Sequence, residues 1–217
     1  MDFNPAYVGS RQDIAELLEG PPTHILDVGC STGSLGANLK RRFPTAQITG
    51  IEYDAEMAQV AKDKLDEVIV ADLDRPDWID KIAHRQFDLI LCADVLEHLR
   101  NPGNVLLVLQ QVLTPEGRLI VSLPNVRHWS VIYQLLIKGD WPLTNSGIFD
   151  RTHLRFFTKS SARRLVEKSG LQIEKIVGKH PFYELTGTFR ESVGRTLGYF
   201  PGVREFIAHQ WILICRK

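Results

Sequence analysis

Cysteine is scarce in this chain, and its three cysteines, Cys30, Cys92 and Cys215, lie far apart. An odd number of scattered cysteines predicts neither a disulfide framework nor a zinc knuckle, because both need several thiols at regular spacings. The N-terminus has no basic region followed by an apolar core, and no run reaches the ~18 apolar residues that a membrane span requires. We therefore expect a soluble, unexported protein of the reducing cytoplasm.

An excess of charge of one sign is also missing. Lys and Arg together number 26, as do Asp and Glu, so the formal net charge is zero. No global field attracts a polyanion, and we expect neither a nucleic-acid partner nor a membrane span. The 217 residues, 44% of them hydrophobic, suit a single α/β domain with a substantial core.

The most informative stretch is 25–33, a short apolar run that leads into a glycine-framed loop and then into helix-forming sequence from 34 to 43. The order of strand, tight turn and helix is typical of a nucleotide-binding α/β unit. Gly29 and Gly33 let the backbone approach a ligand, since a side chain at either position would project into the space for an adenosine. Asp27 adds a carboxylate beside the same cleft.

Two cofactors compete for this loop. A dinucleotide fingerprint requires glycines where the chain has Ser31 and Ser34, which disfavours a nicotinamide-dependent oxidoreductase. The pattern Asp-x-Gly-x-x-x-Gly that is present suits a ligand with an amine and no phosphate, such as S-adenosylmethionine. A tight turn without any ligand is the alternative.

Two further acidic positions follow strand-like runs. Glu52 ends the run 46–51, where doubly wound folds place the residue that binds a ribose diol. Asp72 and Leu73 end the run 67–71. The alternatives are a solvated charge at Glu52 and a turn or helix-capping carboxylate at Asp72.

The run 86–93 is nearly all apolar, as expected of a central strand that is buried on both faces. The segment 94–99, Asp-Val-Leu-Glu-His-Leu, follows its carboxyl end and should face the reacting group of the ligand. A helix from Pro102 to 113 and a strand over 118–123 continue the alternation. Runs at 171–177 and 209–215 supply two more strands.

Residues 24–123 resemble the class I S-adenosylmethionine-dependent methyltransferases of the methyltransferase-23/11-like type, whose first motif commonly reads Asp-x-Gly-Cys-Gly-x-Gly. Ser31 departs from that motif at its middle glycine. The resemblance implies S-adenosylmethionine as cofactor and an α/β, doubly wound, Rossmann-like fold with a seven-stranded, mostly parallel sheet, its last strand antiparallel, helices on both faces and a cap inserted after the fifth strand. It also implies that Asp72 accepts the adenine amine. The cofactor-binding residues it indicates are Asp27, Gly29, Cys30, Ser31, Gly33, Glu52, Tyr53, Asp72, Leu73, Ala93 and Asp94.

We predict one domain over 1–217: a leading helix within 1–22 covering the sheet edge, the cofactor-binding core 24–123, an acceptor cap 124–158, and a C-terminal helix and strands over 159–217. A capping pair, Ser10 and Asp13, should begin the leading helix. The stretch 182–206 lacks firm periodicity. A loop folded onto the sheet edge fits it better than an exposed amphipathic helix for dimerisation or membrane docking, and monomer or homodimer both remain open.

The acceptor cap, residues 124–158, is rich in aromatic and basic side chains, and long insertions at strand ends commonly bind substrates. Residues 124–129 and 141–144 also resemble the methionine-biosynthesis W-type proteins, and residues 150–158 resemble methyltransferases encoded with glycan-building enzymes. We predict transfer of a methyl group to a hydroxyl of a small-molecule, glycan or lipid-linked acceptor. The alternatives are a catalytically silent regulatory subunit, and a helix over 129–136 that packs its aromatics in the core.

A hydroxyl that attacks a methyl group must lose its proton, and histidine is the natural base. His98, His128 and His153 are the candidates, although histidines at such positions are more often structural. The rival role is metal binding by Asp94, Glu97, His98 and His153, because similarly spaced residues bind divalent ions in some ribose and quinol methyltransferases. Asp94 replaces the longer Glu of those enzymes, so the sequence favours a metal-free base.

Overall fold

The computed structural model describes residues 8–179 and 205–217, so most of the stretch 182–206 lies outside the described residues. Its seven strands form one sheet in the order β3-β2-β1-β4-β5-β7-β6. Strands β1 to β5 pair in parallel, whereas β7 runs antiparallel to both β5 and β6, as predicted. The strands are β1 (His24–Val28), β2 (Gln47–Glu52), β3 (Glu67–Val70), β4 (Phe87–Ala93), β5 (Leu113–Pro124), β6 (Gln172–Lys179) and β7 (Gln210–Arg216).

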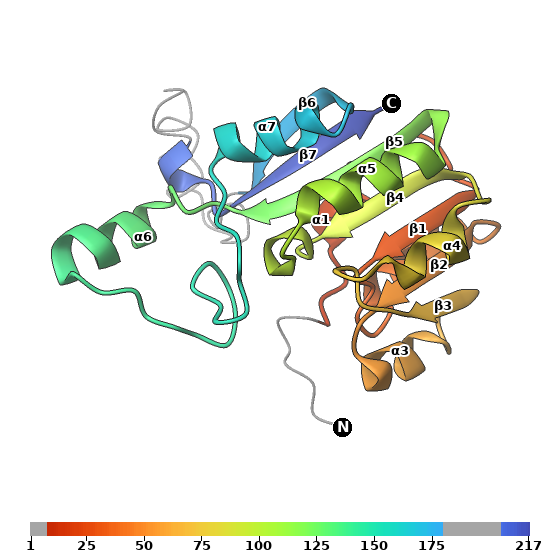
Figure 1. Ribbon diagram of the computed structural model, residues 1–217, viewed down its shortest axis with the longest axis horizontal. Coiled ribbons are helices and arrows are strands. Elements are labelled where there is room, and N and C mark those ends of the chain that lie inside the picture. Colours follow the sequence, from red (N-terminus) through yellow and green to blue (C-terminus); the bar gives the residue numbers. More distant parts are fainter. Residues whose placement is uncertain (1–7, 180–204) are drawn as a thin grey trace, which may run out of the picture.

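Helices cover both faces of the sheet. Figure 1 shows α4, α5 and α7 on one face, and α1, α2 and part of α3 share a core with the opposite face. Alternate residues of β4 enter the two cores, which explains its unbroken apolar run. The helical segments are α1 (Gln12–Ala15), α2 (Ser34–Arg42), α3 (Ala55–Ala61), η2 (Pro76–Trp78), α4 (Ile79–Ile82), η3 (Leu96–His98), α5 (Pro102–Val112), α6 (Trp129–Ile132), the π-helical η4 (Tyr133–Lys138) and α7 (Lys159–Lys168).

The leading helix differs from the prediction. It has only four residues, and it packs on a face of the sheet rather than at its edge, because the fully buried Ile14 belongs to the core formed with β1, β4 and β5. The expected capping pair does not form. Arg11 is the N-cap residue, with left-handed backbone and no side-chain cap, and Asp13 accepts hydrogen bonds from its guanidinium instead.

Two other helices begin at side-chain caps. Asp54 accepts hydrogen bonds from the backbone N–H groups of Glu56 and Met57, both at 2.9 Å, and so begins α3. Thr158 and Ser161 form a capping box at the start of α7. Both caps join residues only two or three positions apart in the chain.

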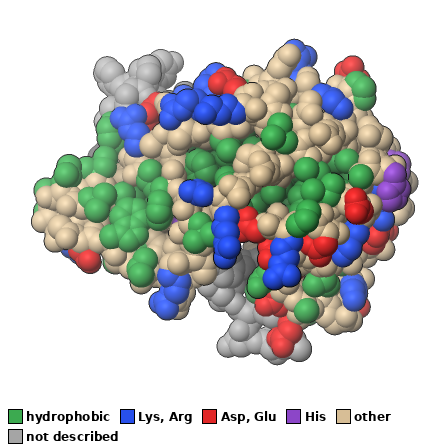
Figure 2. Space-filling view, in the orientation of Figure 1, with side chains coloured by type: hydrophobic (Ala, Val, Ile, Leu, Met, Phe, Trp, Pro, Cys, Tyr) green, Lys and Arg blue, Asp and Glu red, His purple; other side chains and the backbone are tan. Residues whose placement is uncertain are grey.

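The cap helix is not packed as a core helix. Of α6, only Val131 is buried, whereas Trp129 is 54% exposed and Tyr133, in η4, is 45% exposed. The alternative in which this helix buries its aromatic side chains is therefore wrong. Figure 1 shows the reason: α6 projects beyond the ends of β4 and β5, where no second layer among the described residues covers it. Hydrophobic side chains gather on that end of the molecule in Figure 2.

A smaller aromatic cluster holds the cap together. The ring of Trp141 meets those of Phe149 and Phe156 edge to face, with centroids 4.9 and 5.2 Å apart. The cap returns to the core beside η3, since Leu154 and Arg155 both donate backbone hydrogen bonds to the carbonyl of Glu97. None of the helices in the described ranges has the length and apolar character of a membrane span.

Candidate active site

A cavity of about 660 Å³ opens at the carboxyl ends of the central parallel strands, where α/β folds bind ligands. Loops from four strands meet there, and Leu154 of the cap adds to its wall. Most of the predicted cofactor-binding residues line it: Gly29, Ser31, Glu52, Tyr53, Asp72, Leu73, Ala93 and Asp94.

Cys30, Gly33 and Asp27 are not part of this lining. The Cys30 thiol is buried under the loop beside Gly50, and burial raises its pKa, so it serves as a core residue. A Cβ at Gly33 would lie 3.2 Å from Ala61. The expectation that a side chain at Gly33 would enter the adenosine space is therefore wrong, because this glycine allows α2 to begin close against α3.

The glycine loop is built from three residues with positive φ: Gly29 at 75°, Ser31 at 50° and Gly33 at 73°. The N–H groups of Gly29 and Cys30 both donate to the carbonyl of Ile51, which fixes the loop over β2. Ser31 thus has the left-handed conformation that explains why related sequences commonly have glycine there.

Gly29 is the most constrained residue of the loop. A Cβ there would lie 2.8 Å from Val95 Cγ2, whereas one at Gly139, where φ is 64°, would meet nothing within 4 Å. We expect Gly29→Ala to lower the free energy of unfolding by ~1–3 kcal/mol more than the control Gly139→Ala, because both are strained but only Gly29→Ala overpacks the cavity wall. Urea unfolding of both variants measures this difference, and equal losses would contradict the contact with Val95.

Glu52 braces the loop. Its Oε2 accepts a hydrogen bond from the N–H of Ser31 at 2.7 Å, and its Oε1 accepts one from the N–H of Asp54 at 2.9 Å. The carboxylate therefore joins the glycine loop to the start of α3 while it lines the cavity. The sequence predicted the position of Glu52 but not this bracing role.

Asp27 lies buried beside the loop at the end of β1, and its Oδ2 has no hydrogen-bond partner among the described residues. Burial, together with the nearby Glu52 charge, raises the pKa of Asp27 to about 7, although Arg11 opposes this shift. A buried carboxyl that lacks a partner is suited to the ammonium group of an amino-acid ligand.

Affinity for S-adenosylhomocysteine should depend on Asp27 ionisation. An ammonium group paired with Asp27, as we predict, would favour the charged carboxylate, so binding should lower a pKa that is about 7 in the free protein. Affinity should therefore fall by about tenfold per pH unit as the pH drops below that value. Calorimetric titrations between about pH 5 and 7 test this, and Asp27→Asn should bind weakly with a flat profile. A sloping profile in Asp27→Asn would assign the dependence to another group.

Asp94 belongs to a polar network that the sequence did not reveal. Its backbone has a φ of 55°. The Arg11 guanidinium pairs with Asp94 and donates to Ser122 Oγ at 3.0 Å. Ser122 and Gln210 donate to Asp94 Oδ1, at 2.9 and 2.8 Å. Arg11 was missed because it is 83 residues away in the chain and belongs to no local motif.

His98 lines the cavity, and His153 lies directly behind it, with the two ring centroids 4.8 Å apart. The side chain of His153 is only 6% exposed, and its Nε2 is 4.0 Å from an oxygen of the buried Glu97. Burial lowers the pKa of both histidines and raises that of Glu97. Both rings are therefore neutral at neutral pH, as a proton acceptor must be.

His128 is not part of this cluster. It is the buried N-cap residue of α6, where its Nδ1 accepts a hydrogen bond from the Ser130 backbone, and its ring lies 5.5 Å from that of His209. The described lining of the cavity does not include it. The structure thus gives His128 a helix-capping contact rather than a place beside the ligand space.

The predicted metal set comes together only in part. One potential ligand atom from each of Glu97, His98 and His153 lies within 4.8 Å of the others, whereas Asp94 is bound in the Arg11 network. Nitrogen ligands lie at ~2.1 Å from a zinc ion, so two of them are at most ~4.2 Å apart. A small movement of these side chains would bring the three within that reach.

The family model described as a methyltransferase domain matches residues 8–176. The chain belongs to this family. The match and the seven-stranded, mostly parallel sheet confirm a class I S-adenosylmethionine-dependent methyltransferase, with S-adenosylmethionine as its cofactor.

Relatives with similar sequences carry a more specific name. A ubiquinone biosynthesis O-methyltransferase of Aeromonas salmonicida is 26% identical over 159 residues, which are 72% of this methyltransferase and 66% of the relative. One of Coxiella burnetii is 27% identical over 180 residues, 81% of this chain and 74% of that protein. The chain thus spans about two thirds of the length of the first of these relatives.

Solved structures share the fold at low sequence identity. A methyltransferase from Archaeoglobus fulgidus aligns with a TM-score of 0.64 and 14% identity, over 95% of this chain and 90% of that one. Magnesium protoporphyrin IX methyltransferase from Synechocystis, solved with bound S-adenosylhomocysteine, has a TM-score of 0.58 and 18% identity, over 91% and 75% of the two chains. At these identities the likeness establishes the fold.

Proposed function

We propose that this methyltransferase transfers the methyl group of S-adenosylmethionine to a hydroxyl oxygen, with His98 as the base. The observation that carries the proposal is the position of His98, a neutral histidine in the wall of the cavity and directly after the central strand β4. The names of the O-methyltransferase relatives support oxygen as the acceptor atom.

Each cofactor-binding residue would contact a different chemical group of S-adenosylmethionine. Asp27 would pair with the ammonium group through its partnerless oxygen, and Glu52 would accept the ribose hydroxyls while it braces the loop. Asp72 would accept the adenine amine, with the N–H of Leu73 facing a ring nitrogen. Each role uses the hydrogen-bonding capacity of the residue that is present.

The transfer itself needs positioning more than covalent catalysis. Bound S-adenosylmethionine would supply the methyl group, its carbon–sulfur electron pair remaining on sulfur as the oxygen–carbon bond forms, and His98 would accept the hydroxyl proton. The half-buried ring limits water at that point, and its lowered pKa keeps the acceptor nitrogen unprotonated at neutral pH.

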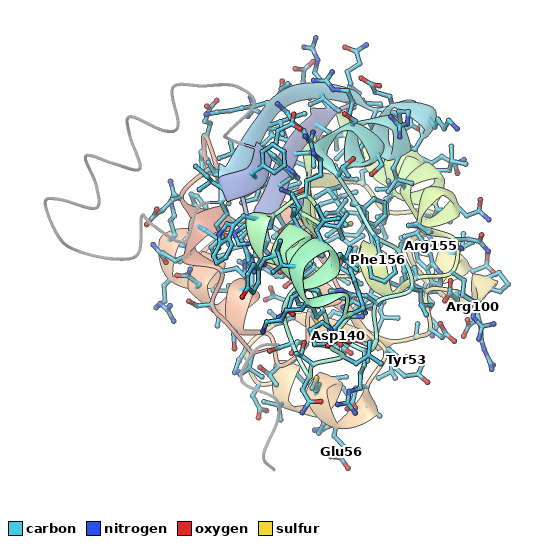
Figure 3. The ribbon with its side chains drawn as sticks, turned by 90° about the vertical axis from the view of Figure 1, so that its left-hand side faces the viewer. Tyr53, Glu56, Arg100, Asp140, Arg155 and Phe156 are labelled. Carbon is cyan, nitrogen blue, oxygen red and sulfur yellow. The ribbon has the colours of Figure 1, made fainter. Side chains whose placement is uncertain are left out.

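The cap would receive the acceptor. Thr152 and Leu154 line the same cavity as the cofactor residues. Figure 3 looks onto this side, where Tyr53 and Phe156 are 74% and 49% exposed, and Arg100 and Arg155 are also labelled. Apolar side chains around the opening favour a hydroxyl carried by a partly apolar small molecule, or by a glycan or lipid-linked acceptor with an apolar portion.

Two experiments test the function. Binding of S-adenosylhomocysteine to the purified protein, measured by calorimetry, should be saturable below millimolar concentration. Incubation with methyl-labelled S-adenosylmethionine and fractionated cell extract should then place label in one fraction, in a linkage that resists base-catalysed ester hydrolysis. Label in an ester or on nitrogen would contradict transfer to a hydroxyl.

A metal-assisted form of the same reaction is the second candidate, because Glu97, His98 and His153 lie close enough to share an ion after a small movement. A divalent ion would polarise the acceptor oxygen and so replace the base. Activity that a chelator abolishes and an added divalent ion restores would support it. Activity that survives the chelator would leave the base mechanism in place.

A further inference from the structure

The ring of His98 is held by a chain of polar groups that begins in the cap. Its Nδ1 lies 2.9 Å from Thr152 Oγ1 and 3.3 Å from the carbonyl oxygen of the same residue. Thr152 Oγ1 lies in turn 2.7 Å from Oδ1 of Asp150, a carboxylate that is only 3% exposed. His98, Thr152 and Asp150 thus form one hydrogen-bonded chain, although the sequence indicated no common role for them.

The direction of these hydrogen bonds follows from what each group can donate. A hydroxyl has one hydrogen, and the carboxylate of Asp150 can only accept, so the Thr152 hydroxyl donates to Asp150. Its oxygen is then the acceptor for His98 Nδ1. The Thr152 carbonyl beside Nδ1 can also only accept, which leads independently to the same assignment. Nδ1 therefore bears the proton.

We propose that Thr152, oriented by Asp150, is a positioning residue that holds His98 in the tautomer with its proton on Nδ1 and its lone pair on Nε2. The tautomer assignment itself does not depend on the proposed function. Only its consequence for catalysis rests on the proposed role of His98 as the base. In the opposite tautomer, Nδ1 would hold the lone pair against the Thr152 carbonyl, and Nε2 would carry a hydrogen and could accept no proton from a hydroxyl.

The arrangement also gives the cap a second role. Asp150 is fixed by the backbone N–H of Thr152, which donates to its Oδ1 at 2.8 Å. The cap segment that packs against η3 therefore also carries the groups that orient the His98 ring. An enzyme whose cap is displaced would retain its cofactor cleft, but its His98 would lose the group that fixes its tautomer.

Nitrogen-15 NMR of protein labelled at histidine tests this directly, at about pH 8, above the ordinary histidine pKa of roughly 6.5. The His98 signals are identified by their loss in His98→Gln. In the wild type we expect a protonated Nδ1 and an unprotonated Nε2. Thr152→Val removes the nearer acceptor, at 2.9 Å, and keeps the carbonyl at 3.3 Å, so it should shift these signals part of the way toward a mixture of tautomers. Thr152→Ser should restore them.

The matched control is Thr144→Val. It also removes a cap hydroxyl, one that donates to the Ser146 carbonyl at 2.8 Å, but it does not touch His98. Its His98 signals should equal those of the wild type. With the acceptor fraction identified above, kcat should fall by roughly 10- to 100-fold in Thr152→Val, the usual range for an outer partner of a functional histidine. The KM for S-adenosylmethionine should not change.

An Nε2-protonated ring in the wild type, or signals in Thr152→Val equal to the wild type, would overturn the inference. A fall in kcat without a change of tautomer would overturn it as well, because the effect would then be structural. The NMR result needs no turnover. If His98→Ala retains full activity while the tautomer depends on Thr152, the proposed base is wrong and the positioning inference stands.

Discussion

His98→Ala should lower kcat by about 10²- to 10⁴-fold and leave the affinity for S-adenosylhomocysteine unchanged. The ring lines the cavity beside the cleft, and burial lowers its pKa, so its loss removes a proton acceptor and no predicted cofactor contact. Initial rates with methyl-labelled cofactor and saturating acceptor give kcat, and calorimetry gives the affinity. Because the His98 ring lies in the cavity wall and belongs to neither apolar core, the variant should fold.

His153→Ala is the comparison that assigns the role. His153 lies behind His98, with a nearly buried side chain, and its Nδ1 is 3.3 Å from the Ile148 carbonyl. If His98 is the base, His153→Ala should cost less than His98→Ala. A larger loss in His153→Ala would make His153 the base, and wild-type turnover in both variants would leave neither histidine with a role.

The fold and most of the cofactor cleft were predictable because their signals are local. Glycines mark the turn after β1, and Glu52 and Asp72 follow directly on strands whose carboxyl ends must meet at one edge of a parallel sheet. The positions of these residues along the chain therefore determine their positions in the cleft. Gly33 was misinterpreted because the same residue type serves both ligand approach and close helix packing.

The catalytic surroundings were less predictable, because they depend on contacts between distant segments. Arg11 reaches Asp94 from the N-cap position before α1, and Thr152 reaches His98 across 54 residues. Neither contact follows from periodicity or from a motif. The alternative in which the cap helix packs its aromatic side chains in the core was wrong for a related reason. An apolar stripe predicts that a helix will pack, but not whether the fold supplies a surface to cover it.

Glu52→Ala should weaken binding of S-adenosylhomocysteine at least tenfold. It removes the proposed acceptor for two ribose hydroxyls, each charge-assisted hydrogen bond being worth at most about 1.5–3 kcal/mol. It also leaves the N–H groups of Ser31 and Asp54 without the carboxylate that joins them, so the glycine loop loses its brace. Calorimetry at fixed pH measures the loss, and unchanged affinity would refute the ribose assignment.

The two causes of that loss are separable by changing the ligand as well as the protein. An analogue of S-adenosylhomocysteine without the ribose hydroxyls should bind the wild type more weakly, since Glu52 then has nothing to accept from. In Glu52→Ala the analogue and the parent ligand should bind alike, because the interacting partner is already gone. An equal penalty for the analogue in both proteins would mean that Glu52 braces the loop without contacting the ribose. Asp54→Ala is the matched control, because it removes the N-cap of α3 but keeps the Glu52 carboxylate, and it should retain the full difference between the two ligands.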